Sequence, residues 1–563
     1  MISNQYDTAY CSYQEKHQWN RFSFMKVAFS ILFALLVARM IDLTCYQRVF
    51  LTSEGNKYSQ KLASSQQDRL EIVDTNGQKL AINVAAKTIW IDPAVIQWTD
   101  RQRKQVAVLL KISEESLAQK SRQAGKRFVY LKRKVNPEVA KALTQLKIKG
   151  LHADNDNRRY YTSGYEFANL LGRTGIEGSG LEGIEFGLNE KLAQEKTDGY
   201  FEVDRFGRMI MKSDAPLNGQ NIALAIDARF QKTAYELLKD AVLAHEADYG
   251  SMVVMNPKTG EVVAMAQFPT VNPNESTLAY DQNSNNRAVT DLFEPGSVIK
   301  PIILSAVMEH HPIDLEQMIN VEKGKWNLNG HLIKDVSVGH DQLSVKDIIK
   351  RSSNIGMSKL ALSVPFESIL NSLDRFGFGQ KLTNIYPGVK AGNLPILSEQ
   401  DQIGVAGLSY GYGIAVNQLQ LTHAYSIIAN DGKDAGVHFL KQSHGINSQE
   451  QVISKEISEQ VRKTLAAAAE HDGTAKRASV PGIKIGGKTG TTIINQDKAN
   501  GYEALFAGIV PIDNPKWVIS VMIHRPRVNG YYGGLVAAPI FSKMVKKVFF
   551  MPETGKSEMN SQL

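Results

Sequence analysis

Three short strings along the chain contain the residue types that an acyl-transfer site needs. Ser297 and Lys300 lie three residues apart in the first string, Ser-Val-Ile-Lys. Ser352 and Asn354 belong to the second, Ser-Ser-Asn, and the third, Lys-Thr-Gly-Thr, begins at Lys488. A serine beside a lysine can form an acyl-serine intermediate, because the lysine takes the hydroxyl proton during attack. Each string is weak alone, but their order and wide spacing together predict an acyl-serine site.

The first string is expected at the start of a helix. Positions i and i+3 share a helix face, so Ser297 and Lys300 would project to the same side about one turn apart. Pro295 and Gly296 precede the serine and suit a turn leading into a helix. A lysine is a base only when neutral, so its pKa must be lowered by burial or by a nearby cation such as Lys488.

The third string has the form of an edge strand. Gly490 lets another backbone approach closely, as a peptide must when it adds itself to the edge of a sheet. Lys488 and the hydroxyls of Thr489 and Thr491 are expected to hold a terminal carboxylate. The amides of Ser297 and Thr491 are expected to form an oxyanion hole, which often contributes about 3 kcal/mol per donor.

The second string supports two interpretations. Ser352 can pass a proton to the leaving group while Asn354 orients the substrate amide. Alternatively, Ser352-Ser353-Asn354 simply caps the helix that follows. Ser297 can likewise be a helix cap and Lys300 a solvated charge, and the third string an ordinary strand end. Taken together, the three strings favour the catalytic interpretation.

The strings and their flanks resemble the three motifs of class B penicillin-binding proteins. The matching strings are Glu294-Pro295-Gly296-Ser297-Val298-Ile299-Lys300-Pro301, Ser352-Ser353-Asn354-Ile355-Gly356 and Gly487-Lys488-Thr489-Gly490-Thr491. Further matches are Arg159 to Tyr161, Gly180 to Glu185, Asp204 to Arg208, Asn286 to Asp291, Tyr410 to Gly413 and Tyr531 to Pro539. Glu-Pro-Gly-Ser, Ser-Ser-Asn and Lys-Thr-Gly are typical of the division-specific, FtsI-like branch (penicillin-binding protein 3 type) rather than of the elongation branch.

Three residues depart from the usual pattern of that family. Thr162 stands where proline is usual, Leu70 where glycine is common after Arg69, and Asp472 where glycine usually opens Gly-Gly-Thr-Ala. None belongs to the predicted chemistry. The departures suggest a divergent member or a paralogue.

The resemblance implies a peptidoglycan D,D-transpeptidase of septal cell-wall synthesis, without cofactor or metal and inhibited by β-lactam antibiotics. Ser297 would attack the penultimate D-alanine of a stem peptide, and an amine of a neighbouring stem peptide would take the acyl group. No glycosyltransferase domain is found in the sequence, so another protein must make the glycan strands. The implied partners are stem peptides, the lipid-linked precursor, a membrane glycosyltransferase of the SEDS family (FtsW-like) and other divisome proteins.

Two alternative functions share the three motifs. A serine β-lactamase needs a way to activate the deacylating water, and the sequence shows no carboxylate motif for that purpose. A non-catalytic penicillin-binding receptor or scaffold would keep the fold, but the intact Ser297, Lys300 and Lys488 favour an enzyme.

Composition adds limits on the function. The net charge is +8, which suits either an anionic membrane and cell wall or a merely basic surface, and no nucleic-acid motif accompanies it. The two cysteines are Cys11 and Cys45. Beyond residue 45 the sequence therefore offers no disulfide, zinc site or catalytic thiol, which is compatible with a periplasmic location.

Residues 22–43 are predicted to form a single transmembrane anchor. At about 1.5 Å per residue they span about 33 Å, enough for a bilayer core. Lys26 and Arg39 interrupt the apolar run near its ends, where their side chains can reach the interface. No Ala-x-Ala cleavage site follows, so an uncleaved anchor is favoured over a signal peptide. The resemblance places residues 1–21 in the cytoplasm and the catalytic region in the periplasm, on the inner membrane.

The remainder reads as an α+β pedestal, residues 44–220, an α+β transpeptidase domain, 221–552, and a flexible tail, 553–563. Asn76-Gly77 predicts a hairpin, and Arg158, Arg159, Glu182 and Glu185 favour buried salt bridges over an active site. A helix at 226–245 and strands at 250–255, 261–266, 483–491, 504–510 and 517–523 are expected, with a last helix at 537–550. Their order predicts a β-lactamase-like domain whose central antiparallel sheet is flanked by helices.

Overall fold

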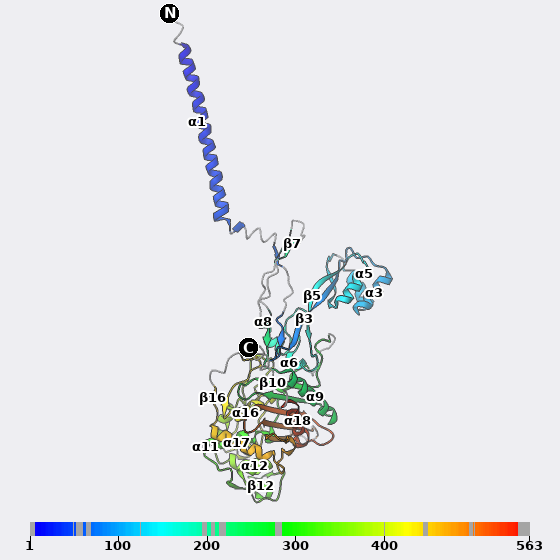
Figure 1. Ribbon diagram of the computed structural model, residues 1–563, viewed down its shortest axis with the longest axis vertical. Helices are drawn as coiled ribbons and strands as arrows, with labels where there is room; N and C mark the ends of the chain where they lie inside the picture. Colours follow the sequence, from blue (N-terminus) through cyan, green and yellow to red (C-terminus); the bar gives the residue numbers. More distant parts are fainter. Residues whose placement is uncertain are drawn as a thin grey trace, which may run out of the picture. The chain divides into compact units, whose positions relative to one another are not determined.

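The computed structural model describes residues 6–48, 50–51, 60–62, 69–123, 125–193, 200–203, 209–212, 221–275, 284–398, 400–442, 449–494, 499 and 501–549 (Figure 1). The chain forms two compact units. One comprises residues 1–65 and 195–218, and the other comprises residues 66–194 and 219–563. The matching string Asp204 to Arg208 and the predicted tail 553–563 lie outside the described residues.

The first unit contains a long N-terminal helix, α1 (Tyr6–Ile41), followed by a π-helical turn (Asp42–Tyr46). Residues 23–46 have a mean hydropathy of 2.1, and apolar side chains such as Phe24, Phe29 and Phe33 are exposed. This helix is long and apolar enough to cross a membrane, as predicted, although α1 begins well before residue 22. The unit also contains a small sheet of β1 (Gln60–Leu62), β6 (Tyr200–Val203) and β7 (Met209–Lys212).

The second unit begins with a five-stranded sheet. Its strands are β4 (Val129–Val135), β3 (Lys79–Ile91), β2 (Ile72–Val73) and β8 (Ile222–Ala223), with β5 (Leu151–Tyr161) also paired to β3. The predicted hairpin is confirmed, since β2 and β3 pair antiparallel around a turn in which Gly77 has φ +83°. Helices α3 (Asp100–Leu110), α4 (Glu114–Ser121) and α5 (Pro137–Gln145) lie near the far ends of β3 and β5 (Figure 1).

The stretch 94–150 contains the strand β4 as well as the helices α3, α4 and α5. In β4, Val129, Leu131 and Val135 are buried in a small core with residues of α3 and α5. The alternating burial along Val129 to Leu131 has a period of two. The exposed residues of the strand are Tyr130 and Lys132.

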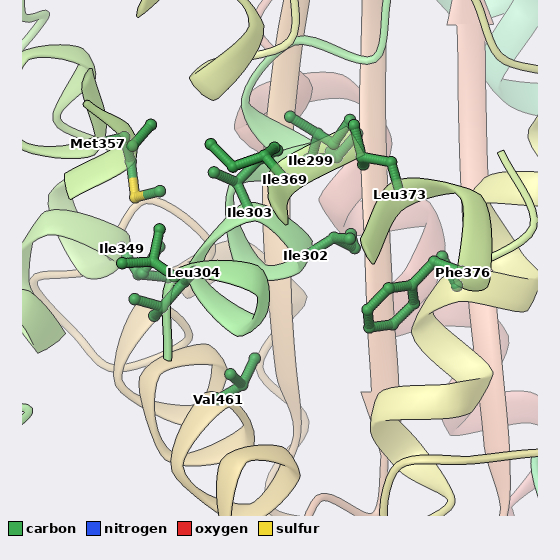
Figure 2. Close-up of a cluster of buried hydrophobic side chains, with 14 of the residues drawn as sticks. Ile299, Ile302, Ile303, Leu304, Ile349, Met357, Ile369, Leu373, Phe376 and Val461 are labelled. Carbon is green, nitrogen blue, oxygen red and sulfur yellow. The ribbon is translucent and has the colours of Figure 1, made fainter. Parts of the chain in front are cut away.

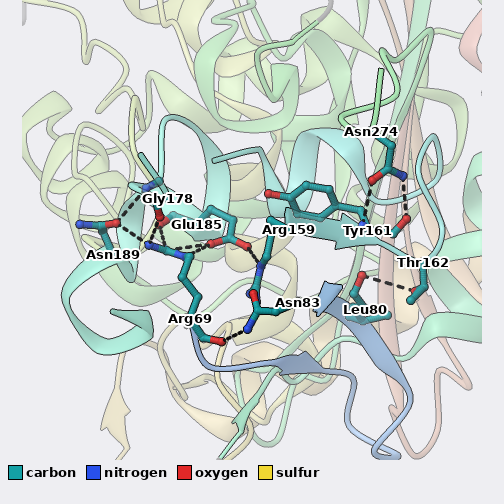
Figure 3. A network of polar contacts seen from close by, with 11 residues as sticks. Arg69, Leu80, Asn83, Arg159, Tyr161, Thr162, Gly178, Glu185, Asn189 and Asn274 are labelled. Atoms are coloured by element: carbon teal, nitrogen blue, oxygen red, sulfur yellow. Dashed lines mark hydrogen bonds and ion pairs between the residues drawn. The ribbon is translucent and has the colours of Figure 1, made fainter. Parts of the chain in front are cut away.

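The short helices α6 (Ala168–Leu171), α7 (Gly183–Gly187) and α8 (Asn189–Leu192) follow β5. A buried ion cluster links Arg69 and Arg159, which lies near the end of β5, to Glu185 of α7. The carboxylate of Glu185 accepts hydrogen bonds from Arg69 Nε at 2.8 Å and from Arg159 Nε at 2.7 Å (Figure 3). Glu182 pairs with Arg173 at 3.2 Å. The predicted buried salt bridge is therefore confirmed for Arg159 and Glu185. The ion pair of Glu182 is partly exposed, and Arg158 is exposed, so the prediction of burial is wrong for these two residues.

The catalytic part is built on a five-stranded antiparallel sheet in the order β10, β9, β19, β18, β17. The strands are β9 (Tyr249–Met255), β10 (Val262–Phe268), β17 (Gly486–Ile493), β18 (Tyr502–Val510) and β19 (Trp517–His524). The sheet unites early and late segments of the chain, as the sequence predicted. Its last strand, β17, lies at an edge, which confirms the expectation for the third string.

Helices cover both faces of this sheet. Helix α9 (Ala228–Ala244) and helix α18 (Gly533–Val548) pack on one face, where Phe506 meets Phe541 of α18. Helices α11 (Lys300–His310), α16 (Gln418–Ala429) and α17 (Lys455–Ala468) share a core with the other face, where Leu505 and Ala507 lie. Two covered faces explain why β9 is buried along its whole length.

Helix α11 is the centre of the larger core. Ile302, Ile303 and Leu304 point to different sides of the helix and are all fully buried (Figure 2). They contact side chains of α12 (Val345–Arg351), α13 (Asn354–Ala361), α14 (Phe366–Arg375) and α17. Each such isoleucine or leucine contributes about 1.5–3 kcal/mol through burial. The packing therefore holds the N-terminal end of α11, and the first motif, in place.

The other elements of this region are short. They are α10 (Arg287–Thr290), β11 (Met318–Asn320), β12 (Lys325–Leu328), β13 (His331–Lys334), β14 (Gln342–Ser344), α15 (Gln402–Ser409), β15 (Lys433–Asp434), β16 (Glu450–Gln451) and the 3-10 turns Gly296–Ile299, Glu322–Gly324 and Lys476–Ala478. The chain is thus an α+β protein with a helix-flanked antiparallel sheet.

Candidate active site

The nucleophile candidate sits on a tight turn beside the edge strand. Ser297 lies in the 3-10 turn Gly296–Ile299 that leads directly into α11. Gly296 has φ +56°, and a Cβ added to it would lie 2.4 Å from Cγ2 of Thr492 in β17. Gly411 packs closely against the same turn, because a Cβ added to it would lie 2.2 Å from the carbonyl oxygen of Gly296. Only glycine at both positions brings the turn this close to β17.

A buried tyrosine of α16 holds the same turn through a hydrogen bond to its backbone. The hydroxyl of Tyr425, in α16, donates a hydrogen bond of 2.7 Å to the carbonyl oxygen of Val298. Burial raises the pKa of Tyr425 well above its usual value, so the phenol stays protonated as a donor. The backbone next to Ser297 is therefore held by a neutral, buried hydrogen bond.

Lys300 is fully buried one turn after Ser297. Its ammonium nitrogen donates to the carbonyl oxygen of Ser352 at 2.8 Å, to Oγ of Ser352 at 3.2 Å and to Oδ1 of Asn354 at 2.8 Å. Burial lowers the pKa of Lys300 well below its ordinary value, Lys488 lowers it further, and Asp335 partly opposes both. The lysine is thus biased toward the neutral form that a base requires.

The second motif divides into two kinds of residue. Ser352 closes α12 with a left-handed backbone, φ +62°, an uncommon conformation that aims its hydroxyl at the lysines. Ser353 is the N-cap of α13, since its hydroxyl accepts from the amide of Gly356 at 2.9 Å. The capping interpretation therefore holds for Ser353, while Ser352 and Asn354 contact the buried lysines.

Asp335 is an element of this site that sequence reasoning missed. Its carboxylate accepts from the amides of Asn354 at 2.6 Å and Ile355 at 3.0 Å and from the hydroxyl of Ser353 at 2.6 Å. An acid at a helix N-terminus stabilises that end of the helix, here α13. Asp335 comes from the end of β13, about twenty residues before the motif, so no local pattern announces it.

The third motif lies along the exposed edge of β17. Lys488 is fully buried, and its ammonium donates to Oγ of Ser352 at 2.9 Å and to the carbonyl oxygen of Thr489 at 3.1 Å. Burial lowers the pKa of Lys488 to about 7. The hydroxyl of Ser352 is therefore shared by Lys300 and Lys488, which joins all three strings into one network.

Thr489, Gly490 and Thr491 form a wall of an open cleft beside this network. The cleft has a volume of about 1790 Å³ including its mouth, and Ser297, Ser352 and Asn354 also line it. The amide of Gly533 donates to Oγ1 of Thr491 at 3.0 Å, which orients that hydroxyl. Lys300 and Lys488 are fully buried and do not line the cleft.

The structure thus brings together all eight residues that the sequence singled out for chemistry: Ser297, Lys300, Ser352, Asn354, Lys488, Thr489, Gly490 and Thr491. Within the described residues, the hydroxyl of Ser297 makes no hydrogen bond to either lysine. Catalytic hydrogen bonds are often long without substrate and tighten in the complex. No cluster of metal-ligating side chains is found in the part of the chain that the structure describes.

Comparisons with known proteins identify the family. Residues 250–546 match the penicillin-binding protein transpeptidase domain, and residues 64–224 match the penicillin-binding protein dimerisation domain. The chain is 36% identical to the probable peptidoglycan D,D-transpeptidase PbpC of Pseudomonas aeruginosa, over 93% of this chain and 94% of that protein. It is 33% identical to the peptidoglycan D,D-transpeptidase FtsI of Escherichia coli K12, over 94% and 92% of the two chains.

A solved structure has the same arrangement. The crystal structure of a peptidoglycan synthetase from Bifidobacterium adolescentis matches with a TM-score of 0.66 and 25% identity, covering 87% of this chain and 97% of that one. The chain matches FtsI over nearly its whole length. Together with the apolar N-terminal helix, this match indicates a membrane-anchored protein. The chain therefore belongs to the penicillin-binding protein family, with a transpeptidase domain that follows a dimerisation domain.

Proposed function

We propose that this protein is a peptidoglycan D,D-transpeptidase that cross-links stem peptides through an acyl-serine during septal cell-wall synthesis. The observation that carries the proposal is the buried Lys300, which lies one turn after Ser297 and contacts both Ser352 and Asn354. Relatives named as peptidoglycan D,D-transpeptidases support the substrate. The free edge of β17 offers a peptide a strand to pair with.

The first half of the reaction forms the acyl-enzyme. Oγ of Ser297 attacks the carbonyl carbon of the penultimate D-alanine while neutral Lys300 takes its proton. The amides of Ser297 and Thr491 stabilise the oxyanion. The C–N bond then breaks, and the proton passes from Lys300 through the hydroxyl of Ser352 to the leaving nitrogen of the terminal D-alanine.

The second half transfers the acyl group. An amine of a neighbouring stem peptide attacks the ester carbon, a C–N bond forms, and the bond to Oγ of Ser297 breaks. The amine gives its proton to the same relay, and Ser297 regains one. Asn354 holds Lys300 in place for both halves, since its Oδ1 accepts from the lysine and its Nδ2 donates to the carbonyl oxygen of Lys334 at 2.9 Å.

The terminal carboxylate of the donor peptide binds the hydroxyls of Thr489 and Thr491, which line the cleft. Lys488 supports this contact electrostatically from its buried position and lowers the pKa of Lys300. The sequence suggested that Lys488 holds the carboxylate directly. We propose the indirect role instead, because the Lys488 side chain is fully buried.

The cellular setting follows from the anchor and the family. Residues 22–43 would hold the protein in the inner membrane with residues 44–220 and the transpeptidase domain 221–552 in the periplasm. There it would act with an FtsW-like glycosyltransferase of the SEDS family and other divisome proteins on strands made from the lipid-linked precursor. β-Lactams would acylate Ser297.

Labelling with fluorescent penicillin tests the nucleophile. Ser297→Ala is expected to abolish the covalent label, because no ester can form. Ser305→Ala is the matched control, since Ser305 lies in α11, the helix that follows the turn of Ser297, and donates to the carbonyl oxygen of Pro301. Labelling that survives Ser297→Ala would refute the assignment.

The two alternative functions predict different behaviour of the labelled protein. A β-lactamase would release the label within seconds and consume excess antibiotic, whereas a transpeptidase keeps a stable acyl-enzyme. A scaffold would allow a Ser297→Ala allele to complement a depletion strain, and a transpeptidase would not. Filamentation upon depletion would support the division role, and round cells would point to elongation.

A further inference from the structure

One end of the active-site cleft is cationic. Arg351, Lys476 and Arg477 line it together with the motif residues, and no acidic side chain among the described residues does so. Lys476 and Arg477 are exposed and make no ion pair within the described part of the chain. We call these three side chains the basic rim.

Two acidic residues close to Arg351 pair mainly with Lys350, outside the cleft. Asp472 lies outside the cleft and bonds Lys350 at 2.7 Å, more closely than it approaches Arg351 at 3.5 Å. Glu470 also pairs with Lys350, at 3.0 Å. An exposed cluster of like charges is usually only a solvated surface, but here it borders a substrate cleft that contributes no compensating acid.

The position of the basic rim along the edge strand gives it a function. Arg351 immediately precedes Ser352, which faces the leaving group. A Cβ added at Gly534 would lie 2.8 Å from the carbonyl oxygen of Thr474 and 3.6 Å from Cγ2 of Thr489. The segment that carries Lys476 and Arg477 is thereby contiguous with the Thr489 end of β17, whereas Ile493 marks the other end.

The two ends of the strand meet different parts of the substrates. With the scissile carbonyl at Thr491 and the terminal carboxylate toward Thr489, the leaving D-alanine lies at the basic-rim end, and the rest of the donor lies toward Ile493. The acceptor amine attacks along the path by which the D-alanine nitrogen departs, because acyl transfer is the reverse of acylation. The acceptor peptide must therefore lie against the basic rim.

We propose that Arg351, Lys476 and Arg477 form a carboxylate-binding subsite for the acceptor stem peptide, which rests on the transpeptidase function proposed above. Guanidinium groups bind carboxylates through paired hydrogen bonds, and Lys476 adds a point charge. The subsite favours acceptors that carry free carboxylates over acceptors in which these are amidated. In the step itself the acceptor nitrogen forms the new C–N bond, the ester bond to Ser297 breaks, and the amine proton returns to Oγ of Ser297 through the relay.

The test measures acceptor choice separately from acylation. Full-length protein in detergent is acylated with an N-acyl-D-alanyl thioester whose leaving thiol carries the terminal carboxylate, and the free thiol is then removed. The acyl group is then partitioned between water and two synthetic acceptor peptides with the same attacking amine, one with free carboxylates and one fully amidated. Wild type is expected to prefer the free acid. Arg477→Gln should reduce that preference about threefold to tenfold, and Lys476→Gln with Arg477→Gln by about tenfold or more.

Lys463→Gln is the matched control, because Lys463 is exposed on α17 away from the cleft and carries the same charge. Lys463→Gln should leave the preference for the free-acid acceptor unchanged. This result would distinguish binding at the basic rim from a general attraction of the acidic peptide to a cationic protein. An equal preference for both acceptors in wild type, or an unaltered preference in the double variant, would overturn the subsite. Failure of the thioester to acylate wild type would instead refute the transpeptidase function itself.

Discussion

Two clusters of charged side chains in the second unit are both buried but differ in composition: one contains a carboxylate between two guanidiniums, and the other contains two lysines. In the dimerisation domain, Glu185 is fully buried between Arg69 and Arg159, and each guanidinium donates to the one carboxylate (Figure 3). In the transpeptidase domain, Lys300 and Lys488 are fully buried around the hydroxyl of Ser352, and within the described part of the chain no carboxylate bonds either lysine.

The difference shows how pairing separates structure from catalysis. A buried carboxylate that bonds two guanidiniums from distant segments holds those segments together. Two buried lysines without a counterion are pushed toward the neutral state, so their pKa values fall. The first cluster therefore links segments of the fold, and the second is suited to exchange a proton.

The largest expected effect follows from removal of the base. Lys300→Met should lower the rate of penicillin acylation about a thousandfold, because Ser297 loses the group that takes its proton. The fold should persist, since an unbranched apolar side chain suits a fully buried site. Stopped-flow acylation with circular dichroism checks both, and an acylation rate within tenfold of wild type would contradict the role of Lys300.

The corresponding change in the other cluster should affect stability instead. Glu185→Ala leaves two buried guanidiniums without their carboxylate and should lower the free energy of unfolding by about 3–5 kcal/mol. Penicillin acylation per folded molecule should not change. Denaturant titration measures the loss, and Glu182→Ala is the control, because its pair with the partly exposed Arg173 should contribute about 1 kcal/mol or less.

An altered acylation rate in folded Glu185→Ala protein would contradict the separation of the two clusters. So would a stability loss no larger than that of Glu182→Ala.

A smaller effect concerns stability against pH. Lys488 has a pKa of about 7 in the fold and about 10.4 in an unfolded chain, so between these values the unfolded state binds more protons. Stability from this group therefore rises with pH across that window and is constant below it. Lys488→Met should reduce the rise in Tm between pH 7 and pH 9.5, whereas an unchanged rise would mean that Lys488 is not buried as a neutral amine.

Much of this organisation could be predicted from the sequence, for identifiable reasons. The edge strand, the hairpin at Asn76-Gly77 and the helix at 226–245 have strong local patterns, and the structure confirms them. The structure also gathers the eight predicted site residues, although their roles stay predictions. The resemblance indicated the family, which the comparisons confirm.

The rest depends on contacts between distant segments. Asp335 and Tyr425 support the motifs from elements far along the chain, and nothing in their neighbourhood marks them. Gly411 lies in a string that resembles the family, but the string does not reveal its close approach to Gly296. Arg69 was not named as a partner of Glu185, because 116 residues separate them. The basic rim could not be recognised either, since a cationic cleft is defined by which side chains line it.

The pH dependence of acylation tests the central claim most directly. Acylation needs neutral Lys300, so the second-order rate constant of wild type with penicillin should rise with pH and reach its plateau well below 10.4, the pKa of an ordinary lysine. In Lys488→Met the rise should move to higher pH, because the second cation no longer opposes protonation. A wild-type rate that keeps rising to about pH 10.4, or a midpoint that Lys488→Met leaves in place, would contradict the account.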